Sequence, residues 1–205
     1  MTEESQEQPM ITAVMPTCSE VKTIAKVFEG SRKHVNEVLV VDDGSPGSAS
    51  DSAKSGHANV IQVLGNTGKG NTLSIGLTTV QMNRGETMVC LDGNRQHDAR
   101  SIPSTAQRIP DAIEDMVIGS KSLRTASIKL IPVYRRLDQS VLAYEKSLEN
   151  TVKIADSQNG WKAFKRHGLK HFDYAKAGRG IESEMARSAA RMVLRIEEIQ
   201  ITALH

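Results

Sequence analysis

The chain has 205 residues, 39% of them hydrophobic, which is enough for one domain with a sizeable core. Its 26 lysines and arginines against 24 aspartates and glutamates leave a net charge of +2, which argues against a nucleic-acid-binding protein that depends on bulk charge. Aromatic residues make up only 3%, which argues against a stacking platform for single strands and favours an aliphatic core.

The N-terminal residues and the cysteines show no sign of secretion. Residues 1–9 are acidic and polar, unlike a signal peptide, and no run approaches the roughly 18 apolar residues of a membrane span. Cys18 and Cys90 form no CxxC motif, so we expect two free thiols, buried or half-buried, in a reducing cytosol. We expect a cytoplasmic protein with one domain at 10–201, a disordered tail at 1–9, and any membrane contact peripheral at the cytosolic face.

Strand and helix patterns alternate along the chain. Short apolar runs predict strands at 11–14, 38–41, 60–63, 88–91, 116–118 and within 193–201. Apolar residues at helical spacing predict helices at 21–28, 48–55, 71–82, 133–148 and 181–192. The strand–helix–strand order predicts one α/β domain with a parallel sheet, right-handed crossovers and its chemistry at the carboxyl ends of the strands.

Two adjacent carboxylates, Asp42 and Asp43, follow the second predicted strand and precede Gly44 and Ser45. Carboxylates at a strand end can accept hydrogen bonds from a nucleobase or a ribose. Asp, Gly and Ser are also ordinary turn residues, so a binding site and a plain turn both stay open here.

A glycine-rich segment, NTGKG at residues 66–70, follows the third predicted strand and opens a helix. Its glycines would let the backbone approach a phosphate, and Lys69 adds positive charge. It is not a Walker A loop, because Val63 and Gly70 stand where Gly and Ser or Thr are needed. Leu73 replaces the third glycine of GxGxxG. A phosphate-binding loop of another kind and a glycine-rich turn with a surface lysine both remain possible.

Residues 92–98, after the fourth predicted strand, read DGNRQHD. The oxygen donors Asp92, Gln96 and Asp98 suit Mg²⁺ or Mn²⁺ bound together with a diphosphate. Asp-Gly-Asn is also an ordinary turn sequence, and His97 is more typical of a structural residue.

The second half of the chain adds further charged groups. Arg135 and Arg136 begin the predicted helix at 133–148, where paired guanidinium groups can bind phosphate or simply face solvent. The carboxylates at 156–158 and 182–184 could equally be loop caps or helix N-terminal charges.

In chain order, these segments resemble a known enzyme family. They are PTCSE (16–20), VVDDGS (40–45), NTGKG (66–70), LDGNRQHD (91–98), VIGSK (117–121), YRRL (134–137), DSQNGWKAF (156–164) and GIESEM (180–185). The series resembles family 2 glycosyltransferases with the GT-A fold, most of all the dolichyl- or polyprenyl-phosphate mannosyl- and glucosyltransferases. The resemblance covers about residues 10–201. It implies a three-layer α/β fold with a mainly parallel central sheet flanked by helices.

The resemblance also implies a nucleotide-binding site. Pro16 and Glu20 correspond to the family's P-x-Y-N-E loop beside the nucleotide. Asp42 and Asp43 correspond to the pair that contacts base and ribose. Lys69 corresponds to the segment near the nucleotide phosphates.

The resemblance implies a divalent cation, Mg²⁺ or Mn²⁺, next to the donor. The family's motif is D-x-D, usually continuing to Gln and His. Asp92 and Gln96 match it, whereas Asn94 stands where the second Asp belongs. Asp92, Asn94 and Gln96 are therefore the expected metal ligands.

The acceptor side is implied in the same way. The expected acceptor-binding residues are Lys121, Arg135, Arg136, Gln158 and Glu182. The two arginines would grip a lipid phosphate, and Lys121 and Asp156 would join Asp92 as catalytic residues.

The implied activity is the inverting transfer of a hexose from GDP-mannose or UDP-glucose to a polyprenyl or dolichyl phosphate. A phosphate acceptor is already an anionic nucleophile, so the reaction needs alignment more than a strong base. A single displacement at the anomeric carbon inverts its configuration.

Two other hypotheses stay open. Cys18 and Ser19 replace the family's Tyr and Asn, and Asn94 replaces Asp, which would suit a catalytically impaired member acting as a binding or scaffold protein. A sugar-nucleotidyltransferase would share this kind of sheet, but residues 15–18 are not the glycine-rich loop that those enzymes carry after the first strand.

Overall fold

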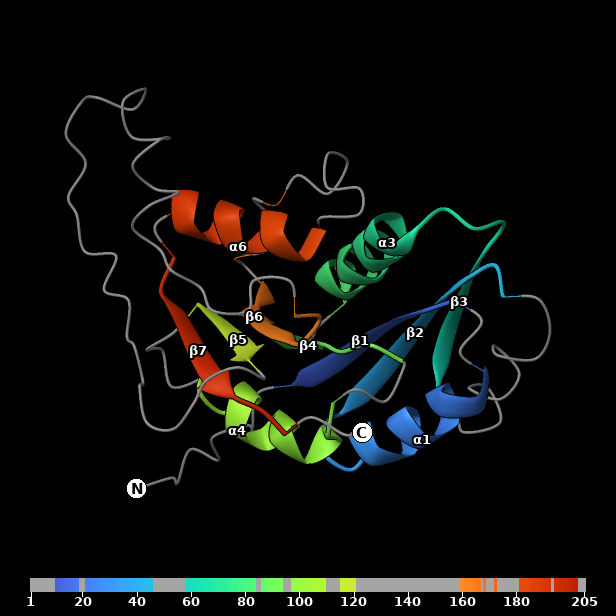
Figure 1. Cartoon of the computed structure of the whole chain (residues 1–205), viewed down its shortest axis with the longest axis horizontal. Helices are drawn as coiled ribbons and strands as arrows, with labels where there is room; N and C mark the ends of the chain where they lie inside the picture. The colour runs from blue at the N-terminus through green and yellow to red at the C-terminus, as the bar shows by residue number, and fades with distance from the viewer. Residues whose placement is uncertain are drawn as a thin grey trace, which may run out of the picture.

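The apolar runs of the sequence form a single sheet. The computed structural model describes residues 10–18, 21–45, 58–83, 86–93, 97–109, 115–120, 159–166, 168, 172, 181–192 and 194–202. Seven strands pair in the order β3-β2-β1-β4-β6-β5-β7 (Figure 1). They are β1 (Ile11–Thr17), β2 (Glu37–Asp43), β3 (Asn59–Val63), β4 (Thr87–Cys90), β5 (Met116–Ser120), β6 (Lys162–Lys165) and β7 (Ile196–Gln200).

Helices cover both faces of the sheet. Figure 1 shows α3 (Lys69–Met82) and α6 (Ile181–Arg191) on one side. On the other side lie α1 (Val21–Ser31) and α4 (Ile102–Ala106), the latter preceded by the 3₁₀ helix η1 (Ala99–Ser101). The predicted three-layer α/β fold is confirmed.

One strand of the seven runs against the others. β1, β2, β3 and β4 are mutually parallel, as are β5 and β7, whereas β6 is antiparallel to both β4 and β5. The prediction of a mainly parallel sheet is thus confirmed, but β6 was not predicted as a strand. It has only four residues, Lys-Ala-Phe-Lys, too short and too polar at its ends to give a strand pattern.

Most of the other predicted elements are confirmed. The predicted strands and the helices at 21–28, 71–82 and 181–192 all appear, within a few residues at their ends. The predicted helices at 48–55 and 133–148 lie outside the described residues, and the domain bounds 10–201 stay a prediction. Both cysteines are free as predicted, but only Cys90 is buried; Cys18 is exposed, because it stands just past the end of β1.

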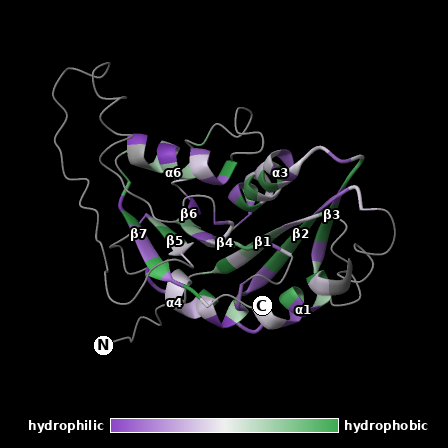
Figure 2. Ribbon diagram, in the orientation of Figure 1, coloured by the Kyte–Doolittle hydropathy of each residue, from purple (hydrophilic) through white to green (hydrophobic). Residues whose placement is uncertain are grey.

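The core has two halves, one on each face of the sheet, because successive strand residues point to opposite faces. Val14, Val41 and Cys90 pack beneath α3 and α6, whereas their neighbours Met15 and Val40 pack against α1 and α4. Figure 2 shows hydrophobic residues along the strands that lie between the two layers of helices. No helix among the described residues is long and apolar enough to cross a bilayer.

The close approach of α3 to the sheet depends on Gly76. A Cβ at this position would lie 2.6 Å from Cγ1 of Val14 and 3.0 Å from Cγ2 of Val41. Gly76→Val should therefore destabilise the fold by about 2 kcal/mol through overpacking, measured as a lower urea midpoint. Ser74→Ala on the same helix is the control, and a Gly76→Val protein as stable as this control would contradict the packing argument.

Candidate active site

Four charged residues meet at the edge of the sheet where the parallel strands end. Asp43 is the last residue of β2, and Asp92 lies two residues beyond β4. Lys69 is the first residue of α3, and Glu182 is in the first turn of α6. Asp43 alternates with Leu39 and Val41, which face α3 and α6, and the ion pairs of Lys69 place Asp92 and Glu182 on that side of the sheet as well.

The ammonium group of Lys69 lies between two carboxylates. Its Nζ is 2.8 Å from Oδ1 of Asp92 and 2.6 Å from Oε1 of Glu182. Burial lowers the pKa of Lys69, but the charges and hydrogen bonds of the two carboxylates outweigh burial and hold this pKa above its ordinary value. The Lys69 side chain is 44% exposed, against 15% for Asp92 and 10% for Glu182. Lys69 is therefore a charged group on the solvent side of two sheltered carboxylates.

Asp43 holds the glycine-rich turn that starts α3. Its Oδ1 accepts hydrogen bonds from the Thr67 N–H at 2.8 Å and the Thr67 hydroxyl at 2.7 Å, and its Oδ2 accepts one from the Gly68 N–H at 2.8 Å. Burial raises the pKa of Asp43, but these hydrogen bonds outweigh it, so the pKa lies below its ordinary value. Both oxygens of this carboxylate thus accept hydrogen bonds from the turn.

Asp42 keeps one oxygen without a partner. The residue is fully buried, and its Oδ1 accepts hydrogen bonds from the N–H and the hydroxyl of Ser45. Its Oδ2 is buried and has no hydrogen-bond partner among the described residues. A buried carboxylate oxygen of this kind is costly to leave unpaired.

Two helices begin at this edge and favour an anion there. The first N–H groups of a helix have no intrahelical partner, and the N-terminus carries partial positive charge. α3 begins directly after Gly68, whose φ of 91° is a conformation that glycine adopts without strain. With Lys69 next to it, the start of α3 suits a phosphate or diphosphate group.

The end of β1 lies beside the glycine-rich turn. Pro16 is buried in β1, and the exposed Cys18 follows the strand. The Cys18 thiol donates to the backbone carbonyl of Asp43 at 3.7 Å and accepts from the Asn66 side-chain amide at 3.5 Å. The thiol therefore touches both segments that the sequence assigns to the nucleotide.

Asp92 is the one expected metal ligand that the described residues include. Its carboxylate already holds a cation, the Lys69 ammonium, and carboxylate oxygens are donors that Mg²⁺ and Mn²⁺ accept. No group of three or more His, Cys, Asp and Glu side chains in the described part of the chain is arranged to hold a metal. The Asp92 carboxylate is thus chemically suited to a divalent cation.

The remaining expected site residues lie outside the described residues. They are Glu20, Asn94, Gln96, Lys121, Arg135, Arg136, Asp156 and Gln158. Two residues of the 92–98 segment have structural partners: Asp98 caps η1 and pairs with Arg100, and the ring of His97 packs edge-on against Trp161 at 5.6 Å.

Sequence reasoning missed three residues of the site. Thr67 donates two hydrogen bonds to Asp43, Gly160 lies against the Asp92 carboxylate, and Lys162 is buried nearby in β6. The signal for Lys162 was a lysine inside the otherwise apolar run WKAF, a position where a charge needs a reason.

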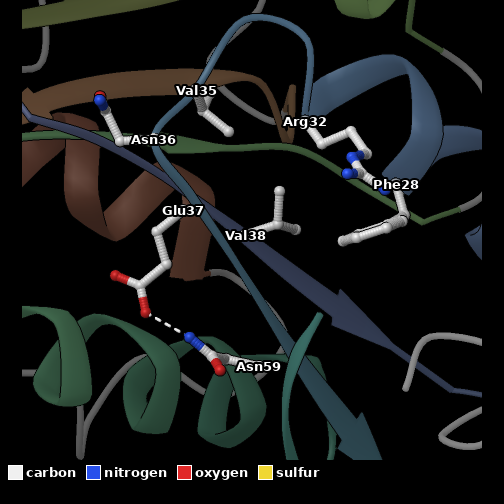
Figure 3. A pocket seen from close by; sticks show the side chains of 7 residues that line it. All are labelled: Phe28, Arg32, Val35, Asn36, Glu37, Val38 and Asn59. Carbon is white, nitrogen blue, oxygen red and sulfur yellow. Dashed lines mark hydrogen bonds between the residues drawn. The ribbon is translucent and has the colours of Figure 1, made fainter. Parts of the chain in front are cut away.

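A hollow of about 260 Å³ lies at the opposite, amino end of β2, lined by Phe28, Arg32, Val35, Asn36, Glu37, Val38 and Asn59 (Figure 3). Its polar groups have structural partners. Glu37 accepts a hydrogen bond from Asn59, Arg32 lies over the ring of Phe28, and Asn36 accepts from the Ile11 N–H. This hollow therefore lacks the converging polar groups of a binding site.

Replacing Asp43 tests its role in the turn. Asp43→Asn should lower the free energy of unfolding by about 1–3 kcal/mol at neutral pH, because the bonds from Thr67 and Gly68 lose a charged acceptor. Since the folded-state pKa of Asp43 lies below 3.8, this advantage of the wild type is complete above that pH and is lost as pH falls through the lowered value.

Urea unfolding of the two proteins from neutral pH to about pH 3 measures both effects. Glu29→Gln, which alters an exposed carboxylate on α1, is the control. A difference between wild type and Asp43→Asn that stays constant across the pH range would contradict the role given to the Asp43 charge.

Comparison with known proteins shows the family to which the chain belongs. The sequence profile of glycosyl transferase family 2 matches residues 12–172. An undecaprenyl-phosphate mannosyltransferase of Micrococcus luteus is 23% identical over 94% of this chain and 82% of its own length. A UDP-N-acetylglucosamine–dolichyl-phosphate N-acetylglucosaminyltransferase of Methanococcus voltae is 23% identical over 96% of this chain and 86% of its own.

Solved structures agree on the fold. Glucosyl-3-phosphoglycerate synthase from Mycobacterium tuberculosis, in complex with Mn²⁺, uridine diphosphate and phosphoglyceric acid, superposes with a TM-score of 0.71. It is 18% identical and covers 96% of this chain and 71% of its own. The predicted GT-A fold is therefore confirmed, and the chain belongs to glycosyl transferase family 2, as a glycosyltransferase that uses a nucleotide-sugar donor.

Proposed function

We propose that the protein transfers a hexose, with inversion, from GDP-mannose or UDP-glucose to a polyprenyl or dolichyl phosphate. The observation that carries this proposal is the Lys69 ammonium held between Asp92 and Glu182 at the start of two helices. This arrangement suits the diphosphate of a nucleotide-sugar on one side and a sugar acceptor on the other. The acceptor class follows the names of the similar transferases, which act on undecaprenyl and dolichyl phosphates.

On the donor side, each described residue has a distinct task in this proposal. Lys69, the most exposed of its cluster, turns from the carboxylates to the diphosphate. Asp42 accepts a hydrogen bond from the nucleoside through its unpartnered oxygen. Asp43 keeps the turn in shape so that the start of α3 faces the phosphates. Pro16 and Glu20 border the nucleotide, as the resemblance implies.

A divalent cation, Mg²⁺ or Mn²⁺, would be held by Asp92 together with Asn94 and Gln96. When bound, it would neutralise the charge that develops on the departing nucleoside diphosphate. A GT-A structure of low sequence identity has been solved with Mn²⁺ and uridine diphosphate, which supports metal use in this proposal. Lys69 contributes a second positive charge to the same leaving group.

On the acceptor side, Arg135 and Arg136 would bind the lipid phosphate, with Lys121 next to the sugar phosphate. Asp156, Gln158 and Glu182 would surround the sugar; of all these residues Glu182 is the described one, and it lies within the Lys69 cluster. The phosphate oxygen attacks the anomeric carbon opposite the leaving diphosphate, so the protein has to align two anionic reactants more than remove a proton. A lipid acceptor would place the reaction at the cytosolic face of a membrane.

The direct test incubates the purified protein with Mg²⁺ or Mn²⁺, labelled GDP-mannose or UDP-glucose, and a polyprenyl phosphate. The wild type should form sugar-lipid, and Asp92→Asn should reduce kcat by about 100-fold because the cation and Lys69 lose a charged partner. Glu29→Gln, which also replaces a carboxylate by an amide but at an exposed position, is the control and should leave kcat unchanged.

No product above a heat-killed control with either donor would overturn the proposed reaction. If calorimetry then found nucleoside diphosphate bound without transfer, the protein would be the alternative, a family member that binds but does not catalyse.

The exposed position of Cys18 allows a gain-of-function test. Cys18→Tyr would supply the ring that the family resemblance expects beside the base, and stacking on a base contributes about 1 kcal/mol or more. Nucleoside diphosphate should therefore bind at least about 5-fold more tightly to this variant in calorimetry. Cys18→Ser is the control, and equal affinity of Cys18→Tyr and Cys18→Ser would contradict a nucleotide at this place.

A further inference from the structure

Lys162 is a lysine in the middle of the sheet. It is 1% exposed, and its Cα lies between Cys90 of β4 and Ile118 of β5 in the strand register. A buried ammonium group is costly unless it is hydrogen-bonded and its charge is balanced. Its Nζ donates a hydrogen bond to the backbone carbonyl of Asn159, three residues earlier in the chain. The lysine therefore holds the turn that leads into its own strand.

That turn is also tied by its own side chain and lies against Asp92. The Asn159 Oδ1 accepts a hydrogen bond from the Trp161 N–H at 2.9 Å. A Cβ added to Gly160, between them, would lie 2.6 Å from both carboxylate oxygens of Asp92. Residues 159–161 thus form the surface on which the Asp92 carboxylate rests, and a glycine is needed at the point of contact.

Charge balance also links Lys162 to the site. Burial raises the pKa of the Cys90 thiol to about 12, and four charged groups act on this thiol: Lys162, Asp92, Glu182 and Lys69. Lys162 and the three charged groups Lys69, Asp92 and Glu182 therefore all act electrostatically on the same buried thiol. Lys69 is 44% exposed and belongs to the start of a helix, whereas Lys162 is fixed at the centre of the sheet.

We propose that Lys162 is a positioning residue of the active site, whose ammonium group fixes the 159–161 turn and through it the Asp92 carboxylate. The role matters most when Lys69 leaves Asp92 for a diphosphate, because the 159–161 turn that Lys162 holds still contacts the Asp92 carboxylate. The inference rests on the proposed function, since it assigns Asp92 to the nucleotide-bound cation.

The size of the effect follows from the kind of contact. A methionine in place of Lys162 would fill a similar volume, and replacing a buried charge by an apolar side chain often leaves a fold as stable as before. The Asn159 carbonyl, however, would lose its charged donor, and the turn under Asp92 would lose its anchor. Mutation of a residue that orients a metal ligand typically weakens metal affinity by roughly 10- to 100-fold.

The test compares Lys162→Met with Lys165→Met, the same substitution three residues along β6 on the opposite face of the sheet. Binding of Mn²⁺ in the presence of GDP or UDP is measured by electron paramagnetic resonance, and folding by the Tm. Lys162→Met should bind Mn²⁺ roughly 10- to 100-fold more weakly with a Tm within a few degrees of wild type. Lys165→Met should bind like the wild type, and Lys162→Arg, which keeps the charge, should retain more affinity than Lys162→Met.

Gly160→Ala is the second variant and leaves Lys162 in place. Its added Cβ displaces the Asp92 carboxylate, so it should also weaken Mn²⁺ binding by about 10-fold or more, and it decides the matter if Lys162→Met does not fold. Folded variants at Lys162 and Gly160 that bind Mn²⁺ like the wild type would overturn the positioning role alone. A wild type that binds neither Mn²⁺ nor either diphosphate would overturn the proposed function with it.

Discussion

The sharing of one ammonium group by two carboxylates is the contact around which the candidate site is organised. Lys69 links the start of α3 to the residue beyond β4 and to the first turn of α6, three segments that are far apart in the sequence. Without the lysine, Asp92 and Glu182 would face each other across a partly buried space, where like charges repel strongly. The same lysine is the most exposed member of the cluster, so an anion from solvent can compete for it.

The reversed direction of β6 is what brings the support for this cluster to the right edge of the sheet. A strand that enters at the carboxyl ends of β4 and β5 starts where its neighbours finish, so the turn before it lies beside Asp92. A parallel strand at the same place would have presented its last residues here and its entry turn at the far edge. The one antiparallel strand of the sheet therefore places the turn before it, at residues 159–161, in contact with the Asp92 carboxylate.

The elements that the sequence predicted correctly are those whose signal is local. Apolar runs such as Val38–Val41 identify buried strands because each residue in the run is itself hydrophobic. The glycines around Lys69 likewise indicate where a helix starts. The strand β6 and the contact of Lys69 with Glu182 depend on pairing across more than 70 residues, which no local pattern encodes. For Asp43 the predicted nucleotide contact stays a prediction, and the structure adds hydrogen bonds from the backbone and hydroxyl of residues 67 and 68 that depend on the turn geometry and could not be predicted from residue type.

The two adjacent aspartates, Asp42 and Asp43, have different hydrogen-bond partners. Because they are neighbours on a strand, their side chains point to opposite faces, and only Asp43 faces the turn that starts α3. Asp43 accepts three hydrogen bonds from the turn, whereas Asp42 retains a buried oxygen without a partner among the described residues, which is costly to the fold. The two neighbours thus differ in their surroundings: Asp43 keeps the glycine-rich turn in place, whereas Asp42 keeps one buried oxygen without a hydrogen-bond partner among the described residues.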